Sequence, residues 1–142
     1  MQTVNQLLQR KGFDVATINS KASVFEALEL MADKGIGSLV VMEENSIAGL
    51  FSERDYARNI ILKGRTSKDT RVEEIMTSQV IVVRPDQTME ECMAIMTDKR
   101  VRHLPVMRSN ELVGIISIGD LVKAIIEEQQ FVIDQLVSYI NG

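Results

Sequence analysis

Two short segments place a hydroxyl and a carboxylate at the same spacing, directly after an apolar stretch. The first is Gly49-Leu-Phe-Ser-Glu-Arg-Asp55 and the second is Gly114-Ile-Ile-Ser-Ile-Gly-Asp120. In each, the Ser ends a predicted strand and the Asp follows three residues later, where a helix begins. The start of a helix has unpaired N–H groups that suit an anion, and an Asp there accepts hydrogen bonds from sugar hydroxyls. A single Ser-x-x-Asp is more often a plain helix cap, so the second copy is what favours a ligand site.

The duplication extends well beyond these two motifs. Residues 17–61 align with residues 82–126 without a gap, and 13 of the 45 aligned pairs are identical. Each copy is predicted to be β-α-β-β-α, and a unit of about 50 residues has too little core to stand alone. We therefore expect an α/β (α+β) fold in which two repeats pack sheet to sheet with pseudo-twofold symmetry, leaving a cleft on either side of the axis.

Apolar periodicity, glycines and cap residues set the predicted elements. In the first repeat, Ser23 caps a helix, and the elements are a strand 15–18, a helix 24–34, strands 36–42 and 47–51, and a helix 53–62. In the second repeat, Thr88 caps a helix, and the elements are a strand 80–83, a helix 89–99, strands 101–107 and 112–117, and a helix 120–128. Short helices are expected at 3–11 and at 72–76, the latter capped by Thr70 in a box with Glu73.

These elements divide the chain into five segments. They are an N-terminal helix (1–12), the first repeat (13–64), a linker with a short helix (65–79), the second repeat (80–128), and a C-terminal helix extension (129–142). The extension keeps helical spacing of apolar residues, so we expect it to continue the preceding helix and to pack on something.

Composition excludes several classes of protein. The formal net charge of −4 and the scarcity of aromatic residues argue against a nucleic-acid partner. No apolar run approaches the roughly 20 residues of a membrane span, and a single cysteine fits a reducing compartment, so we expect a cytoplasmic protein with no membrane partner. Cys92 and His103, the only cysteine and histidine, have no obvious third group for catalysis and no metal-ligand spacing. We therefore expect no catalytic residues, no bound metal and no enzyme activity.

On these features the chain resembles a tandem pair of cystathionine-β-synthase (CBS) domains, also called a Bateman module. The resemblance covers about residues 13–128 and rests on the duplicated order of elements, the two Gly-x-x-Ser-x-x-Asp motifs and the segment Arg102-His103-Leu-Pro-Val106. It implies a regulatory sensor that binds an adenine nucleotide between the repeats, with NAD or AMP expected first and ATP as a further candidate. It also implies signalling through dimer contacts or an unknown client protein.

The resemblance further implies how each cleft is assembled, with the Ser and Asp of one repeat facing the first two strands of the other. The carboxylates would accept from ribose hydroxyls, the hydroxyls would donate to a phosphate, and apolar neighbours would enclose the adenine. One cleft would combine Ser117 and Asp120 with Thr17, Ile18, Gly37 and Ser38. The other would combine Ser52 and Asp55 with Val82, Val83, Val101, Arg102 and His103.

The two clefts differ in the positive charge expected around them. The cations near Asp55 are Arg54, Arg58, Lys63, Arg65 and Arg102, whereas Lys123 is the cation expected near Asp120. Since guanidinium groups pair with phosphate in two places, the Asp55 cleft should hold the more highly phosphorylated ligand. A solvated helix face with its linker explains the 54–65 group equally well. The segment 102–103 is expected to be half-buried, where a charge needs a ligand or a carboxylate partner.

One alternative to a sensor is a structural adaptor, a dimer whose clefts bind nothing. The N-terminal helix and the amphipathic tail 129–140 would then be partner-binding faces. In either case we expect a homodimer, because apolar pairs such as Ile60/Ile61 and Ile125/Ile126 exceed what one small module can bury.

Overall fold

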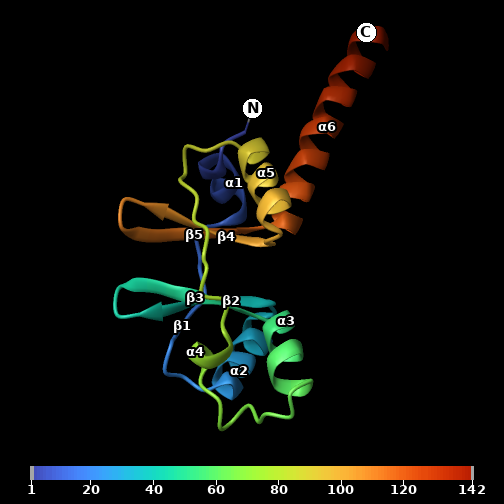
Figure 1. Ribbon diagram of the computed structural model, residues 1–142. Coiled ribbons are helices and arrows are strands. Elements are labelled where there is room, and N and C mark those ends of the chain that lie inside the picture. The colour runs from blue at the N-terminus through green and yellow to red at the C-terminus, as the bar shows by residue number, and fades with distance from the viewer. Residues whose placement is uncertain (1, 142) are drawn as a thin grey trace. The chain divides into compact units, whose positions relative to one another are not determined.

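The computed structural model describes residues 2–141, which form two compact units (Figure 1). The central unit is Val15–Ile81. The terminal unit joins the N-terminal segment, up to Asp14, to the chain from Val82 onward. The helix that precedes the first repeat therefore belongs with the second repeat. The predicted packing of sheet against sheet stays a prediction.

The central unit is built on a three-stranded sheet in the order β1-β2-β3. Strand β1 runs parallel to β2, and β2 pairs with β3 in an antiparallel hairpin. The elements are β1 (Thr17–Asn19), α2 (Val24–Lys34), β2 (Ser38–Glu43), β3 (Ser46–Ser52), α3 (Glu53–Tyr56), the π-helical turn η1 (Ala57–Ile61) and α4 (Val72–Ile75). This is the predicted β-α-β-β-α order.

Helix α2 shows why these residues fold locally as they do. The Ser23 hydroxyl accepts a hydrogen bond from the Glu26 N–H at 3.1 Å, which satisfies one free donor of the first turn. The helix ends at Gly35, whose φ of 64° is the left-handed conformation that glycine adopts at little cost. Its buried face, Val24, Ala27 and Met31, belongs to the same core as the inward residues of β2 and β3.

The terminal unit has a two-stranded antiparallel sheet, β4-β5. Its elements are α1 (Val4–Lys11), α5 (Met89–Lys99), β4 (His103–Arg108), β5 (Glu111–Ser117) and α6 (Ile118–Asn141). The predicted tail is confirmed as a continuation of the last helix, since α6 is a single helix of 24 residues. Figure 1 shows its C-terminal part extending away from α1 and α5.

The strand predicted at 80–83 is reduced to a single parallel bridge between Val83 and Val106. In the central unit the corresponding ladder includes bonds from the Val40 N–H to the Ala16 carbonyl and from the Ser20 N–H to the Met42 carbonyl. The residues at the positions of Val40 and Ser20 in the second repeat are Pro105 and Pro85. Because proline has no N–H, both of these bonds are lost.

Two smaller expectations are also wrong. Thr70 does not cap α4, because its hydroxyl donates to the Thr66 carbonyl at 2.8 Å. Instead, the Arg71 N–H at the start of α4 donates to Glu74 Oε2 at 2.7 Å. The predicted helix 53–62 is α-helical only to Tyr56 and then widens into the π turn η1.

Each unit packs one short helix segment against the glycine of its motif. A Cβ atom at Gly114 would lie 2.7 Å from Leu8 Cδ1 of α1. A Cβ atom at Gly49 would lie 2.6 Å from Met76 Sδ and 2.7 Å from the Thr77 carbonyl oxygen, just after α4. These glycines thus let a neighbouring segment come close to the strand that carries the Ser-x-x-Asp motif.

Among residues 2–141, no helix combines the length and the apolar character that crossing a membrane requires.

Candidate functional site

The Ser52–Asp55 motif closes the start of α3 by reciprocal hydrogen bonds. The Asp55 N–H donates to Ser52 Oγ at 3.3 Å, and the Ser52 N–H donates to Asp55 Oδ2 at 2.9 Å. The Ser52 hydroxyl also donates to Asp55 Oδ2 at 3.1 Å. The other carboxylate oxygen, Oδ1, accepts from the hydroxyl of Thr77 at 3.2 Å. Both side chains are only partly buried, so the carboxylate remains open to a further donor.

The Ser117–Asp120 motif repeats this arrangement at the start of α6. The Asp120 N–H donates to Ser117 Oγ at 3.1 Å, and the Ser117 N–H donates to Asp120 Oδ2 at 2.8 Å. Here the additional donor is charged, because Lys11 Nζ lies 2.6 Å from Asp120 Oδ2. Lys11 Nζ also donates to the Ile115 carbonyl at 2.5 Å. The side chains of Lys11 and Asp120 are 33% and 25% exposed, so the ion pair lies at the surface and can be reached by a solute.

The two extra donors reach the equivalent carbonyl and the equivalent carboxylate, although Thr77 bonds Asp55 Oδ1 and Lys11 bonds Asp120 Oδ2. Ile115 occupies the position of Leu50 in the repeat, and the Leu50 carbonyl accepts from the Thr77 N–H at 2.8 Å. One lysine ammonium in the terminal unit thus takes the place of both the amide and the hydroxyl of Thr77 in the central unit.

The charge of Lys11 lowers the pKa values of two groups at the terminal motif, Asp120 and His103. Burial raises the pKa of Asp120, but the hydrogen bonds and charge of Lys11 and the hydrogen bonds of Ser117 outweigh it, so the pKa is lowered. Burial lowers the pKa of His103, the charges of Lys11 and Arg102 lower it further, and Asp120 opposes them. The lowered pKa values favour an ionised Asp120 carboxylate and a neutral His103 imidazole at neutral pH.

In the central unit, the structure brings four predicted site residues together at the start of α3, namely Gly37, Ser38, Ser52 and Asp55. Ser38 and Ser52 are directly opposite in the β2-β3 pair, and the Gly37 carbonyl accepts from the Glu53 N–H at 3.1 Å. Thr17 and Ile18 lie on β1, opposite Val40 and Val41 of β2.

In the terminal unit, His103 and Ser117 are opposite each other in the β4-β5 pair, and Val83 bridges to Val106. Val82 is exposed beside it. Arg102 was expected in a half-buried strand, but β4 begins only at His103 and Arg102 is exposed. An exposed guanidinium needs no buried partner, and burial keeps the His103 imidazole neutral by lowering its pKa, so neither residue requires a ligand to balance a buried charge.

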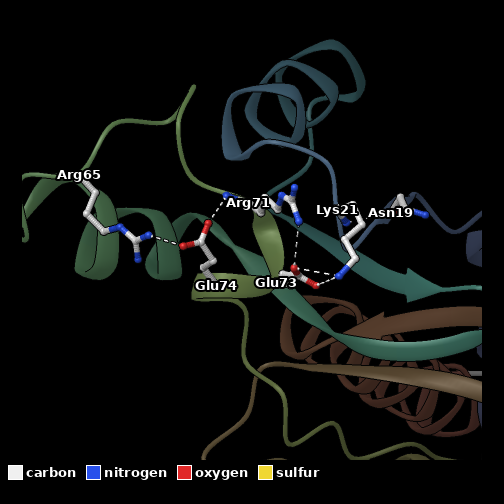
Figure 2. A network of polar contacts seen from close by, with 6 residues as sticks. All are labelled: Asn19, Lys21, Arg65, Arg71, Glu73 and Glu74. Carbon is white, nitrogen blue, oxygen red and sulfur yellow. Dashed lines mark hydrogen bonds and ion pairs between the residues drawn. The ribbon is translucent and has the colours of Figure 1, made fainter.

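The cations predicted around Asp55 lie on the surface of the central unit. Arg54, Arg58, Lys63 and Arg65 are all exposed. Figure 2 shows Arg65 in a network with Glu74, at 2.7 Å, next to the ion pair between Lys21 and Glu73, at 2.9 Å. The Arg71 N–H and then Arg65 lower the pKa of Glu74. Arg65 therefore has a carboxylate partner of its own, which a phosphate would have to displace.

The assembly of each cleft from residues of both repeats, such as Asp120 with Thr17 or Asp55 with Arg102, stays a prediction. Two polar partners were missed altogether, namely Lys11 and Thr77. Both lie outside the aligned repeats, and Lys11 is 109 residues from Asp120. The one sequence signal is that each lies in or just after a short helix that precedes a repeat.

Comparison with known proteins shows which family the chain resembles. The CBS domain model matches the chain twice, over residues 5–62 and 72–127. A mitochondrial CBS domain-containing protein of Arabidopsis thaliana, CBSX3, is 40% identical over 125 residues. That match covers 84% of this chain and 61% of the plant protein, so the chain spans less than two thirds of that relative.

Solved structures of CBS-domain proteins have the same fold as this chain. A Burkholderia ambifaria protein with CBS domains, assigned to signal transduction, has 50% identity and a TM-score of 0.86 over 90% of this chain and 96% of its own. The CBS domain pair of protein MJ0100, in complex with 5′-methylthioadenosine and S-adenosyl-L-methionine, has a TM-score of 0.79 over 90% of this chain and 98% of its own. Its identity is 22%, which shows the fold alone. Since the family model matches both repeats and the fold agrees, the chain belongs to the CBS-domain family.

Proposed function

We propose that this protein is a regulatory module that binds adenine nucleotides at its two Ser-x-x-Asp motifs. The observation that carries the proposal is that the same hydrogen-bonded Ser–Asp arrangement forms twice, each time with a partly exposed carboxylate at the end of a strand. A Ser–Asp cap on its own is common at the start of a helix. Two copies of the cap, each beside small residues and each with an accessible carboxylate, suit the binding of a ribose.

The chemistry of the neighbouring residues supports an adenosine ligand. Asp55 and Asp120 would accept from ribose hydroxyls, and the apolar side chains of the adjoining strands would enclose a purine. The MJ0100 domain pair holds two adenosine compounds, so a fold of this kind accommodates such ligands. NAD and AMP are the first candidates for this chain, and ATP is the next. The role is regulatory, with binding changing contacts to a second copy or to a client protein.

Isothermal titration calorimetry of AMP, ATP and NAD into nucleotide-free protein tests the proposal. Asp55→Asn and Asp120→Asn remove a charge while keeping an oxygen for the cap. Losing a charge-assisted hydrogen bond costs about 1.5–3 kcal/mol, so affinity at the altered motif should fall by about tenfold or more. Asp33→Asn, on an exposed part of α2, is the matched control and should bind normally. If no adenine nucleotide binds the unaltered protein at millimolar concentration, the proposal is wrong.

An exposed apolar surface on α6 favours self-association as part of this function, and equally favours the adaptor alternative. Phe131 is 64% exposed and Ile140 is 78% exposed, with further apolar residues between them. We propose that a second copy covers this surface. Sedimentation of the full chain and of Leu136→Glu tests it: a dimer that the charge dissociates supports the proposal, and a monomeric full chain contradicts it. An adaptor would keep its dimer and its partners in the Asp→Asn variants.

A further inference from the structure

A pocket of about 420 Å³ adjoins Asp120 in the terminal unit, between the end of α1 and the first turns of α6. Its charged residues are Arg10, Lys11, Lys123, Asp120 and Glu127. Three cations against two carboxylates make it locally positive, in a chain whose formal net charge is −4. The volume lies within the range of about 300–1,000 Å³ that is typical of small-molecule sites.

Helix α1 holds two of these cations in place. Val4, Leu7 and Leu8 are buried, and Leu8 meets the strand at Gly114. This anchoring brings the last turn of α1, with Arg10 and Lys11, to the start of α6. Arg10 lies 3.6 Å from Glu127, and Lys11 lies 2.6 Å from Asp120. The two carboxylates of the pocket are therefore neutralised, and Lys123 adds a further positive charge.

Lys11 also has a donor to spare. An ammonium has three N–H groups, and the structure uses two of them, for the Ile115 carbonyl and Asp120. The four-carbon stem of lysine lets the ammonium turn toward a new anion while it stays near Asp120. The equivalent donors in the central unit are the neutral amide and hydroxyl of Thr77, which add no charge at Asp55.

We propose that this pocket binds the phosphate of a nucleotide whose ribose is held at Asp120, with Lys11 as the residue that selects phosphorylated ligands over nucleosides. The inference rests on the proposed function and names the ligand class for one of its two motifs. The pairing is a charge-assisted hydrogen bond between ammonium and phosphate, which is absent for a nucleoside. In the central unit the corresponding donor, Thr77, comes from the segment just after α4 and is neutral, so it supplies no such charge at Asp55.

The test compares adenosine and AMP by calorimetry in the Asp55→Asn background, so that binding at the terminal motif is followed. Lys11→Met keeps the apolar stem and removes the charge; it should weaken AMP binding by about tenfold and leave adenosine within about threefold. Lys11→Arg should restore most of the AMP affinity. Lys99→Met, an exposed lysine of the same unit, is the control and should change neither ligand.

Lys123→Met, on the opposite wall, is a second variant in case Lys11→Met fails to fold, and should weaken AMP more than adenosine. An equal loss for adenosine and AMP in the lysine variants, or no loss for either, would overturn the inference while leaving the proposed function intact. If the unaltered protein binds neither compound, the inference fails, and the proposed function fails with it if ATP and NAD do not bind either.

Discussion

The two units satisfy the same acceptors with different donors, and the difference lies outside the repeated sequence. In the central unit the amide and hydroxyl of Thr77 reach the Leu50 carbonyl and Asp55. In the terminal unit the ammonium of Lys11 reaches the Ile115 carbonyl and Asp120. The motif is therefore conserved between the repeats in shape but not in charge. Sequence identity within a duplicated motif does not determine its electrostatics, because an element from another part of the chain completes it.

The largest expected effect is the difference in stability between alanine variants of the two motif glycines, Gly49 and Gly114. Gly49→Ala would place a Cβ atom 2.7 Å from the Thr77 carbonyl oxygen, which is backbone, whereas Gly114→Ala would meet the flexible end of Leu8. We expect Gly49→Ala to destabilise by about 3 kcal/mol, at the upper end of overpacking, and Gly114→Ala by about 1 kcal/mol. Urea unfolding of both variants measures the difference. Equal destabilisation would mean that both segments adjust equally well, and the contrast between α1 and α4 would be lost.

A smaller effect should appear in the pH dependence, because His103 occupies the position that Ser38 has in the first repeat. The pKa of His103 is lowered in the folded protein, chiefly by burial. Its contribution is therefore fully present above the unfolded pKa of about 6.5 and is lost as the pH falls through the folded pKa. His103→Ser should flatten the loss of unfolding free energy as the pH falls below about 6.5. Urea titrations at several pH values check this, and an unchanged slope would place the acid sensitivity elsewhere.

The smallest effect is expected at Cys92, whose counterpart in the first repeat is Ala27. Both are fully buried on the inner face of their helices. Burial raises the pKa of the Cys92 thiol to about 11, so the native protein should react with a thiol reagent far more slowly than the unfolded protein. Cys92→Ala copies the first repeat and should cost about 1 kcal/mol or less. Fast labelling without denaturant would contradict the burial of this helix face.

Periodicity and cap residues predicted most of the fold. Ser23, Gly35 and Thr88 set helix ends through bonds between neighbours in the sequence, and the duplication identified both Ser-x-x-Asp motifs. The main error was the strand predicted at 80–83, and the missing N–H of proline explains it. The strand at 80–83 has the right apolar residues, but its partner carries Pro105 where an N–H is needed.

The donors to the two carboxylates could not be predicted, since Lys11 and Asp120 are joined only by tertiary folding. The offset that aligns the repeats is 65, whereas the segments that meet the motif glycines, at Leu8 and Met76, are 68 positions apart. The gapless alignment of the repeats, extended beyond them, therefore does not superpose these two segments. Exposure of Arg102 was missed for a related reason, because the strand begins at His103, two residues later than the apolar pattern indicates.

The placement of α1 also bears on the order in which the chain folds during synthesis. The central unit, Val15–Ile81, is contiguous and can close once it has left the ribosome. The terminal unit needs Val4, Leu7 and Leu8 together with strands made much later, so the first helix must wait, unburied, until most of the protein has emerged. A fusion or deletion at the N-terminus should therefore damage the second repeat while sparing the repeat next to it.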